Sequence, residues 1–296
     1  MNANKKLQIL GRGALLLSTL IWGTSFFILK NTLDYVPTLY VLAFRFCGAA
    51  VLLFLFSIRE LKKIDKGYLI AGLFMGLTLL AAYIVQTYGL ALTTPGKNAF
   101  LTSSYCVIAP LLGWALYKKR PDRYNVAASI VCIIGIGFIC LERDLSVNTG
   151  DLLTLCCGVF FALQILVIEK YAAGRSVLLL NMLQFAVAGV LAAILALFTT
   201  PVPTHIPGEA IFSIVYLCIM CSAVCYILQI FGQKHTTSAA TAVIMTLESV
   251  FGALFSGIFY HERFSFKLIV GFVLVFAAVL ISETKLSFLH RRKGEI

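Results

Sequence analysis

The stretch Tyr83-Ile-Val-Gln86-Thr-Tyr-Gly89 returns as Tyr226-Ile-Leu-Gln229-Ile-Phe-Gly232, and 143 residues separate the two copies. The same separation joins further identical residues, namely Thr93-Thr94 to Thr236-Thr237, Tyr117 to Tyr260 and Arg120 to Arg263. Identities held at one separation without a gap are hard to obtain by chance. The sequence therefore predicts that one structural unit is used twice.

The composition indicates what kind of unit this is. Of the 296 residues, 60% are hydrophobic and only 12% are charged, whereas an average soluble domain carries about 25% charged residues. So few charges cannot cover a water-facing surface, which excludes a soluble enzyme. A membrane-spanning helix needs roughly 20 apolar residues. The charged residues leave ten such stretches: 13–29, 38–58, 67–92, 98–117, 124–141, 152–168, 177–199, 210–233, 236–260 and 268–282.

Ten spans shared between two units give five spans to each unit. Because five is odd, the second unit enters the membrane from the opposite side. The predicted fold is an all-α integral membrane protein with ten transmembrane helices, arranged as two inverted five-helix repeats around a central cavity. We expect the repeats at residues 1–145 and 146–296, joined by the short polar stretch Glu142–Asp151. Inverted repeats with a site at the midplane between them are typical of secondary transporters.

The placement of the basic residues predicts how the chain is oriented. The formal net charge is +11, and basic loop residues mark the cytoplasmic side of a membrane protein. With ten spans, eighteen Lys and Arg residues fall on the side of both termini and five fall on the other. We therefore expect a multi-pass protein of the cell membrane with cytoplasmic N- and C-termini. The basic tail is then explained by topology and the lipid bilayer, and no nucleic-acid partner is expected.

Two charged residues lie well inside predicted spans, Arg45 and Glu248. A charge at the bilayer centre costs from about 3 to more than 10 kcal/mol, so each side chain should face a cavity or a partner. Arg45 could bind a substrate carboxylate. Glu248 could bind an amine or take up a proton, because a carboxyl in an apolar environment is readily neutralised. The alternative is structural, with both residues tying helices together.

Polar and aromatic residues in the spans complete the candidate site. Gln86 and Gln229 occupy equivalent positions in the two copies, and buried amides need partners; helix–helix contacts are the alternative. Gln164 and Gln184 are weaker candidates of the same kind. Aromatic residues at mid-span suit a pocket for amphipathic ligands, although plain packing would also explain them. The expected substrate-binding residues are Trp22, Arg45, Tyr83, Gln86, Tyr105, Tyr226, Gln229 and Glu248.

Enzymatic and cofactor-binding motifs are missing from the sequence. No nucleotide-binding loop, zinc-protease motif or nucleophile elbow occurs, so no cofactor and no catalytic residue are expected. Cys218, Cys221 and Cys225 share a helical face, but no His or Met joins them, which favours packing over metal ligation. The remaining alternatives are a passive channel, which needs a continuous polar pore, and an integral-membrane enzyme.

Two stretches resemble a known family. Leu20-Ile-Trp22-Gly23-Thr-Ser-Phe-Phe-Ile-Leu-Lys30, with Pro37 and Arg45-Phe46 after it, is similar to the opening of an EamA-type repeat of the drug/metabolite transporter superfamily. The stretch Leu247–Arg263 with Gly271 is similar to the close of the second repeat, except that Ser249 stands where the family usually has proline. The resemblance implies ten helices in two inverted repeats and metabolite export. Together with the repeat, it predicts a secondary transporter that exports a small amphipathic metabolite, such as an amino acid, by alternating access.

Overall fold

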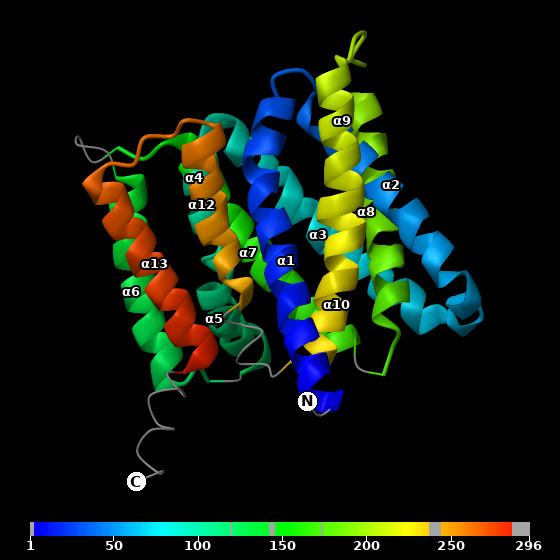
Figure 1. Ribbon diagram of the computed structural model, residues 1–296, viewed down its shortest axis with the longest axis horizontal. Coiled ribbons are helices and arrows are strands. Elements are labelled where there is room, and N and C mark those ends of the chain that lie inside the picture. The colour runs from blue at the N-terminus through cyan, green and yellow to red at the C-terminus, as the bar shows by residue number, and fades with distance from the viewer. Residues whose placement is uncertain (1–2, 119, 142–145, 173, 237–243, 286–296) are drawn as a thin grey trace.

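The computed structural model describes residues 3–118, 120–141, 146–172, 174–236 and 244–285. Within these ranges the chain is helical apart from short connections and one isolated β-bridge between Leu141 and Val147. Figure 1 shows the helices packed side by side in one bundle. In chain order they are α1 (Ala3–Thr32), α2 (Thr38–Ser57), the 3-10 helix η1 (Ile58–Lys63), α3 (Lys66–Leu92), α4 (Pro95–Thr102), α5 (Tyr105–Tyr117), α6 (Arg123–Cys140), α7 (Thr149–Tyr171), α8 (Val177–Thr199), α9 (Gly208–Tyr216), the π-helix η2 (Leu217–Val224), α10 (Cys225–His235), α12 (Leu247–Phe259) and α13 (Phe266–Thr284).

Among the described residues, eight helical segments are long and apolar enough to cross a membrane. They are Lys6–Thr32, Thr38–Lys63, Lys66–Leu92, Pro95–Tyr117, Arg123–Cys140, Thr149–Tyr171, Val177–Thr199 and Gly208–Gly232. Two shorter apolar helices, Leu247–Phe259 and Phe266–Ser282, lie where the sequence predicts the ninth and tenth spans. Part of the predicted ninth span, residues 237–243, lies outside the described residues. The chain is therefore a helical, multi-pass membrane protein.

Two predicted spans are not uniform α-helices. Within the span predicted at 98–117, α4 ends at Thr102 and α5 begins at Tyr105. Within the span predicted at 210–233, eight residues of π-helix separate α9 from α10. The span predicted at 210–233 stays apolar through the π-helix, whereas three polar residues, Thr102, Ser103 and Ser104, mark the break between α4 and α5. Irregular backbone at membrane depth is tolerated where it is buried in protein or lines a cavity. Thr102 and Tyr105, at the break between α4 and α5, line the central cavity described below, whereas Leu217 and Cys221 of the π-helix are fully buried.

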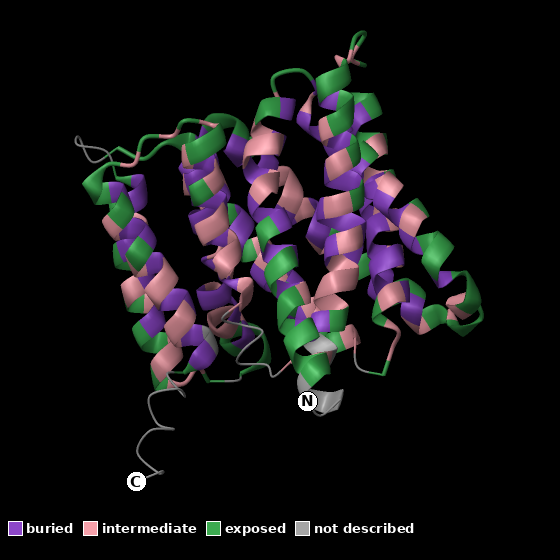
Figure 2. Ribbon diagram, in the orientation of Figure 1, coloured by how far each residue is buried: buried purple, intermediate pink, exposed green. Residues whose placement is uncertain are grey.

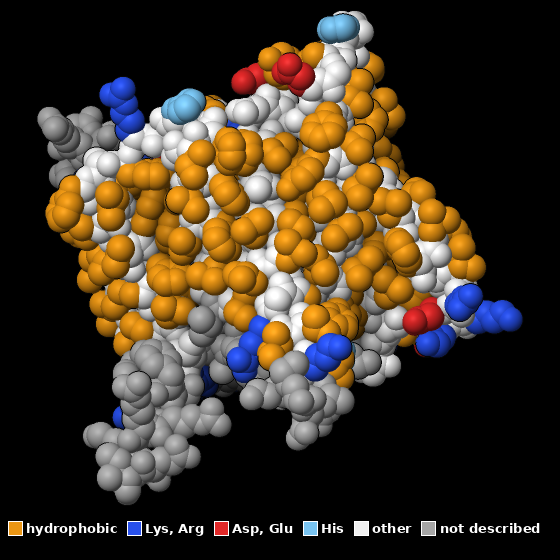
Figure 3. Space-filling model, viewed as in Figure 1, with side chains coloured by type: hydrophobic (Ala, Val, Ile, Leu, Met, Phe, Trp, Pro, Cys, Tyr) orange, Lys and Arg blue, Asp and Glu red, His pale blue; other side chains and the backbone are white. Residues whose placement is uncertain are grey.

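The surface is divided into a wide apolar band and two polar ends. In Figure 3, hydrophobic side chains cover the viewed face between the ends, and charged side chains lie only at the top and bottom. Figure 2 shows that exposed positions follow the outward faces of the helices, while buried positions lie where helices meet. Exposed Lys and Arg residues, among them Arg12, Arg59, Lys62 and Lys63, lie at the end of the bundle where α1 begins. We call this end the basic end.

Asp122 joins the ends of α6 and α13 at the bundle surface. Its carboxylate accepts hydrogen bonds of 3.0 Å from the backbone N–H groups of Tyr124 and Asn125, and so caps α6. Its other oxygen lies 2.6 Å from Nζ of Lys285, at the end of α13. The hydrogen bond from Lys285, followed by those from the backbone, holds the pKa of this carboxyl below its ordinary value. The stabilising contribution is therefore present at neutral pH and is lost as the pH falls through that lowered pKa.

A matched pair of glycines in α6 tests how tightly α6 packs against α13. A Cβ on Gly135 would lie 2.9 Å from both the backbone nitrogen and Cγ2 of Val275, whereas a Cβ on Gly137 would meet only Cδ1 of Leu141, at 3.8 Å. We expect Gly135→Ala to lower the free energy of unfolding by about 1–3 kcal/mol, the usual cost of overpacking. Gly137→Ala should be neutral or slightly stabilising. Thermal unfolding in detergent, followed by tryptophan fluorescence, measures both; equal melting temperatures for the two variants would contradict the packing.

Candidate functional site

A cavity of about 680 Å³ lies between the helices. Its walls come from α1, α2, α3, α4, α5, α7, α8, α10 and α12. All eight residues that the sequence analysis proposes for substrate binding line this one cavity: Trp22, Arg45, Tyr83, Gln86, Tyr105, Tyr226, Gln229 and Glu248. The structure thus brings together residues that are up to 226 positions apart in the chain. We call this space the central cavity.

Arg45 is anchored along one edge and one face of its guanidinium. Its Nε donates a 2.9 Å hydrogen bond to Oγ of Ser222, and its Cζ lies 4.9 Å from the centre of the Tyr83 ring, within the range of a cation–π contact. The side chain is only 2% exposed. No hydrogen-bond partner for its two Nη groups occurs in the described part of the chain. The end of the guanidinium that can bind an anion with two parallel hydrogen bonds is therefore unoccupied by protein.

Ser222 holds Arg45 in the candidate site, and sequence reasoning missed it. It lies in the π-helix η2, where its hydroxyl donates to the backbone oxygen of Leu217 at 3.1 Å and accepts from Arg45. Single π-helical turns often occur at functional sites. A serine within an apolar span carries no signal that it will meet a residue 177 positions earlier, so the sequence alone could not have identified this contact.

Glu248 presents the opposite charge to the same cavity. It lies in the first turn of α12, where the helix dipole favours a negative charge. Its side chain is partly exposed, and the described residues give its carboxylate no hydrogen-bond partner. Arg45 and Glu248, both of which the structure describes, do not form an ion pair within 4.0 Å. The cavity thus holds one guanidinium and one carboxylate that are not neutralised by direct contact with each other.

Aromatic rings frame the cavity in two similar pairs. The rings of Trp22 and Tyr226 meet edge to face at 5.6 Å, and those of Phe161 and Tyr83 do so at 5.3 Å. Tyr105 lies 6.0 Å from Phe161. Edge-to-face pairs hold rings in defined orientations, and Nε1 of Trp22 is fixed further by a 2.6 Å hydrogen bond to a backbone oxygen of η2. The rings therefore form a firm apolar frame with polar tips.

Gln86 and Gln229 are equivalent in the sequence repeat but differ in their contacts. Nε2 of Gln86 donates to Oγ1 of Thr102 at 3.1 Å, so part of its hydrogen-bonding capacity is used within the protein. Gln229 lines the cavity, and no hydrogen-bond partner for its side chain occurs among the described residues. The helix–helix interpretation thus fits Gln86 better, and Gln229 offers a free amide to the cavity.

Further cavity residues were missed or undervalued in the sequence. Asn98 and Asn181 line the cavity, and so does Gln164. Asn98 is fully buried, donates to Oγ1 of Thr154 at 2.8 Å and leaves its Oδ1 without a partner. The available signal was the amide itself, because a buried amide must find partners. The same signal that marks the glutamines as candidates therefore also applies to Asn98 and Asn181.

The cysteine face of η2 and α10 packs against α1. Sγ of Cys221 lies 3.7 Å from the backbone oxygen of Ile21, and Sγ of Cys225 lies 3.6 Å from that of Ser18. Both thiols are oriented as donors to carbonyls of the neighbouring helix. These contacts agree with the packing interpretation of the cysteines.

Two carboxylates bind the α3–α4 connection at the end of the bundle opposite the basic end. Asp151 accepts hydrogen bonds from Oγ1 of Thr93 and, at 3.0 Å, from Nζ of Lys97. Glu262 accepts from Oγ1 of Thr94, from Oγ of Ser256 and, at 2.9 Å, from the backbone N–H of Gly96. Together they fasten the α3–α4 connection to α7 and to the α12–α13 connection. We call these contacts the carboxylate clasp.

The lining of the cavity differs between its two ends. Near the clasp it stops at Leu29, Leu90 and Asn98, all of them buried. In the other direction it reaches Ala172 and Val177, which flank the α7–α8 turn, and Val177 is 43% exposed. That turn packs on the η1–α3 region, because the backbone N–H of residue 176 donates to the Tyr68 hydroxyl. The lining of the cavity therefore runs from buried residues near the clasp to a partly exposed residue near the basic end.

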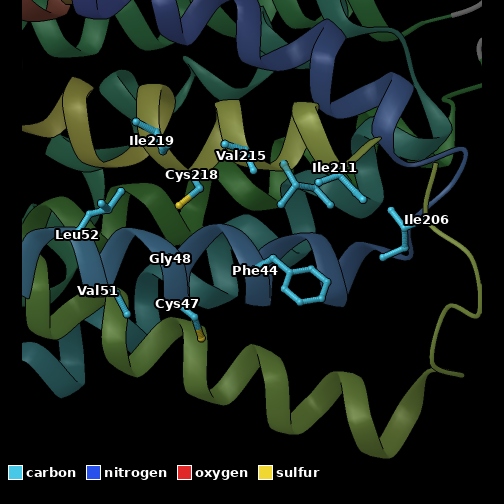
Figure 4. A pocket seen from close by; sticks show the side chains of 11 residues that line it. Phe44, Cys47, Gly48, Val51, Leu52, Ile206, Ile211, Val215, Cys218 and Ile219 are labelled. Carbon is cyan, nitrogen blue, oxygen red and sulfur yellow. The ribbon is translucent and has the colours of Figure 1, made fainter. Parts of the chain in front are cut away.

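A second hollow lies on the outside of the bundle, between α2 and the α9–η2 segment. Figure 4 shows its apolar lining, which includes Phe44, Gly48, Ile211 and Cys218. Its volume is about 670 Å³, close to that of the central cavity, but it contains none of the eight proposed site residues. A groove of this composition suits the acyl chains of the bilayer. Of these two hollows, the central cavity is the one that carries the polar groups needed to orient a metabolite.

Comparison with known proteins places the chain in a family. The sequence pattern of the EamA-like transporter family matches residues 9–141 and again residues 148–284. An uncharacterized transporter of Archaeoglobus fulgidus is 32% identical over 267 residues, which cover 90% of this chain and 83% of the relative. The uncharacterized transporter YoaV of Bacillus subtilis is 20% identical over 93% of this chain and 96% of its own length. Protein PecM of Dickeya dadantii is 22% identical over 92% of each chain.

A solved structure shares the fold. A protein known from its crystal structure superposes on this chain with a TM-score of 0.67 and 14% identity, covering 98% of this chain and 99% of the other. The helical membrane bundle, the central cavity and the two stretches that match one family pattern lead to the same assignment. The chain belongs to the EamA-like transporter family.

Proposed function

We propose that this membrane transporter is a secondary carrier that exports a small zwitterionic metabolite, such as an amino acid, by alternating access. The observation that carries the proposal is the presence of two opposite charges, Arg45 and Glu248, which line one cavity without pairing. An α-amino acid brings a carboxylate and an ammonium group, which match a guanidinium end and a free carboxylate. The aromatic frame would contact the apolar part of the substrate.

Alternating access requires two halves that can move against each other. We propose ten membrane crossings in two inverted repeats, residues 1–145 and 146–296. Recurrent packing supports this arrangement. In the proposed repeats α10 is the counterpart of α3, and α1 is the counterpart of α7; α3 packs on α7, and α10 packs on α1. The ring pairs recur in the same way, with Phe46–Tyr83 at 5.1 Å and Phe185–Tyr226 at 5.0 Å. Rocking of such halves around a fixed midplane site is the common mechanism of carriers built from inverted repeats.

The direction of transport follows from the orientation that we propose. Basic residues concentrate on the cytoplasmic side of membrane proteins, which makes the basic end cytoplasmic and places both termini there. The cavity lining reaches Ala172 and Val177 near that end, so substrate would enter from the cytoplasm. The carboxylate clasp would then close the external side until the halves rock and release the substrate outward.

Glu248 also provides a route for proton coupling. A carboxylate that binds the substrate ammonium cannot hold a proton at the same time, and a protonated carboxyl binds an ammonium group poorly. One residue could therefore exchange a substrate molecule moving outward for a proton moving inward.

Counterflow in proteoliposomes tests the proposed function. Vesicles that contain the purified protein are loaded with a mixture of unlabelled amino acids at about 10 mM, and a trace of each labelled amino acid is added outside in turn. A carrier should drive a transient internal accumulation of its labelled substrate above the equilibrium level. Equilibration without an overshoot would favour a passive channel. Recovery of a chemically altered label would favour an enzyme, and protein-free vesicles serve as the control.

A further inference from the structure

Three amide side chains form a hydrogen-bonded chain in the wall made by α7 and α8. Nε2 of Gln164 donates to Oε1 of Gln184 at 3.3 Å, and Nε2 of Gln184 donates to Oδ1 of Asn181. All three side chains are at least nine-tenths buried, with exposed fractions of 6% for Gln164, 1% for Gln184 and 5% for Asn181. Gln164 and Asn181 line the central cavity, and Gln184 lies behind them.

The chain leaves one acceptor and one donor unused at its two ends. Oε1 of Gln164 and Nδ2 of Asn181 have no hydrogen-bond partner within the described ranges. Reversing all three amides would exchange the roles of the two ends but would still leave one donor and one acceptor. Neither atom is fully buried, and both residues line the central cavity, so a ligand in the cavity can reach both atoms. These two atoms therefore gain from a ligand that can donate and accept at once.

The amide chain stands where the charged part of the site stands in the other half. Gln184 precedes Phe185 as Arg45 precedes Phe46, and the two Phe rings lie 5.6 Å apart. Each Phe ring also meets a tyrosine edge to face, Tyr226 for Phe185 and Tyr83 for Phe46. One half of the cavity thus presents a guanidinium, and the corresponding place in the other half presents neutral amides.

We propose that Gln164 and Asn181 form a neutral subsite that receives the side chain of the transported amino acid and favours a carboxamide. This inference rests on the proposed function, in which Arg45 and Glu248 hold the carboxylate and ammonium groups. A carboxamide accepts from Asn181 and donates to Gln164 with a single planar group. An apolar side chain leaves both amides unpaired. A charged side chain would be dehydrated and would find only neutral hydrogen-bond partners, so its binding is less favourable still.

The experiment compares amino acids of one shape in the counterflow assay on the full chain. L-glutamine, L-methionine and L-glutamate have side chains of similar length, respectively neutral and hydrogen-bonding, apolar, and charged. We expect unlabelled L-glutamine to inhibit counterflow at a concentration about 30-fold lower than that needed for L-methionine or L-glutamate, since two neutral hydrogen bonds have about this effect. Equal inhibition by the three amino acids would overturn the proposed subsite while leaving the carrier function intact.

Near-isosteric variants separate recognition from folding. Gln164→Met combined with Asn181→Leu removes the amide ends and keeps the volume, so the preference for L-glutamine over L-methionine should fall to less than threefold. Val190→Leu, at an outward position of α8 that is 54% exposed, is the control and should keep the preference. An unchanged preference in the double variant would overturn the subsite. If no amino acid gives counterflow and none raises the melting temperature of the wild-type protein, both the proposed function and the subsite are wrong.

Discussion

Arg45→Met should lower the affinity of the carrier for amino acids at least 100-fold. The guanidinium is held by Ser222 and Tyr83 so that its two Nη groups remain free at the cavity. A substrate carboxylate there would accept two charge-assisted hydrogen bonds, each worth about 1.5–3 kcal/mol. Since about 1.4 kcal/mol corresponds to a tenfold change in affinity, losing both bonds gives at least the stated effect. The half-saturating concentration in counterflow measures it.

The alternative for Arg45 is a purely structural role. A comparison of two substrates, an amino acid and its methyl ester, distinguishes carboxylate binding from that structural role. The methyl ester of the same amino acid lacks the carboxylate, so the wild-type protein should bind it far more weakly than the acid. Arg45→Met should bind acid and ester equally. Arg59→Met makes the same exchange at an exposed site near the basic end. It should change neither the affinity for the acid nor the preference for the acid over its ester. A variant that still prefers the acid, but unfolds at a lower temperature, would assign Arg45 to structure.

Arg45→Lys refines the same prediction. Lysine retains the charge but has no Nε–H for Ser222 and no planar fork for a carboxylate. We expect a loss of affinity about midway, on a logarithmic scale, between that of the wild type and that of Arg45→Met. Because the charge is retained, the acid should still be preferred to its ester.

The positions of the charged residues could be predicted from the sequence because the bilayer leaves few options. An ionisable group within an apolar span must face the interior of the protein, so Arg45 and Glu248 had to point inward. The repeat then suggested that Tyr83 and Tyr226 would be related, and both line the central cavity. Periodicity, length and charge were enough for the helical membrane fold. That these residues contact substrate is still a prediction.

Partners that are distant in the sequence could not be predicted. Asp151 lies in a stretch expected to be a linker, yet it is fully buried and bonds Thr93, 58 positions earlier. The π-helix and the break between α4 and α5 are changes in backbone hydrogen bonding, and hydropathy reports only the polarity of side chains. The side-chain rotamers that join three amides into one chain are likewise set by the fold, so the sequence shows two glutamines but not their connection to Asn181.

Glu248→Gln should abolish the pH dependence of transport and weaken the binding of amino acids about 10- to 100-fold. In the wild type, protons and substrate ammonium groups compete for one carboxylate. Lowering the pH on both sides should therefore weaken substrate binding, and lowering it only on the release side should speed export. The amide cannot ionise, so it loses this competition together with a charge-assisted hydrogen bond worth about 1.5–3 kcal/mol. Counterflow between about pH 5.5 and 8 measures both effects.

An analogue of the substrate without its amino group tests whether the pH dependence and the affinity both depend on the contact between Glu248 and the substrate ammonium group. An acid without the amino group cannot bind Glu248 through an ammonium ion, so the wild type should prefer the amino acid and Glu248→Gln should lose most of that preference. Glu209→Gln, at an exposed position in the first turn of α9, is the matched control and should behave as the wild type. A variant that retains the wild-type pH profile rules out coupling through Glu248. One that loses the pH profile but keeps the preference for the amino group assigns the carboxylate to the proton alone, because a residue that binds both cations in turn cannot lose one without the other.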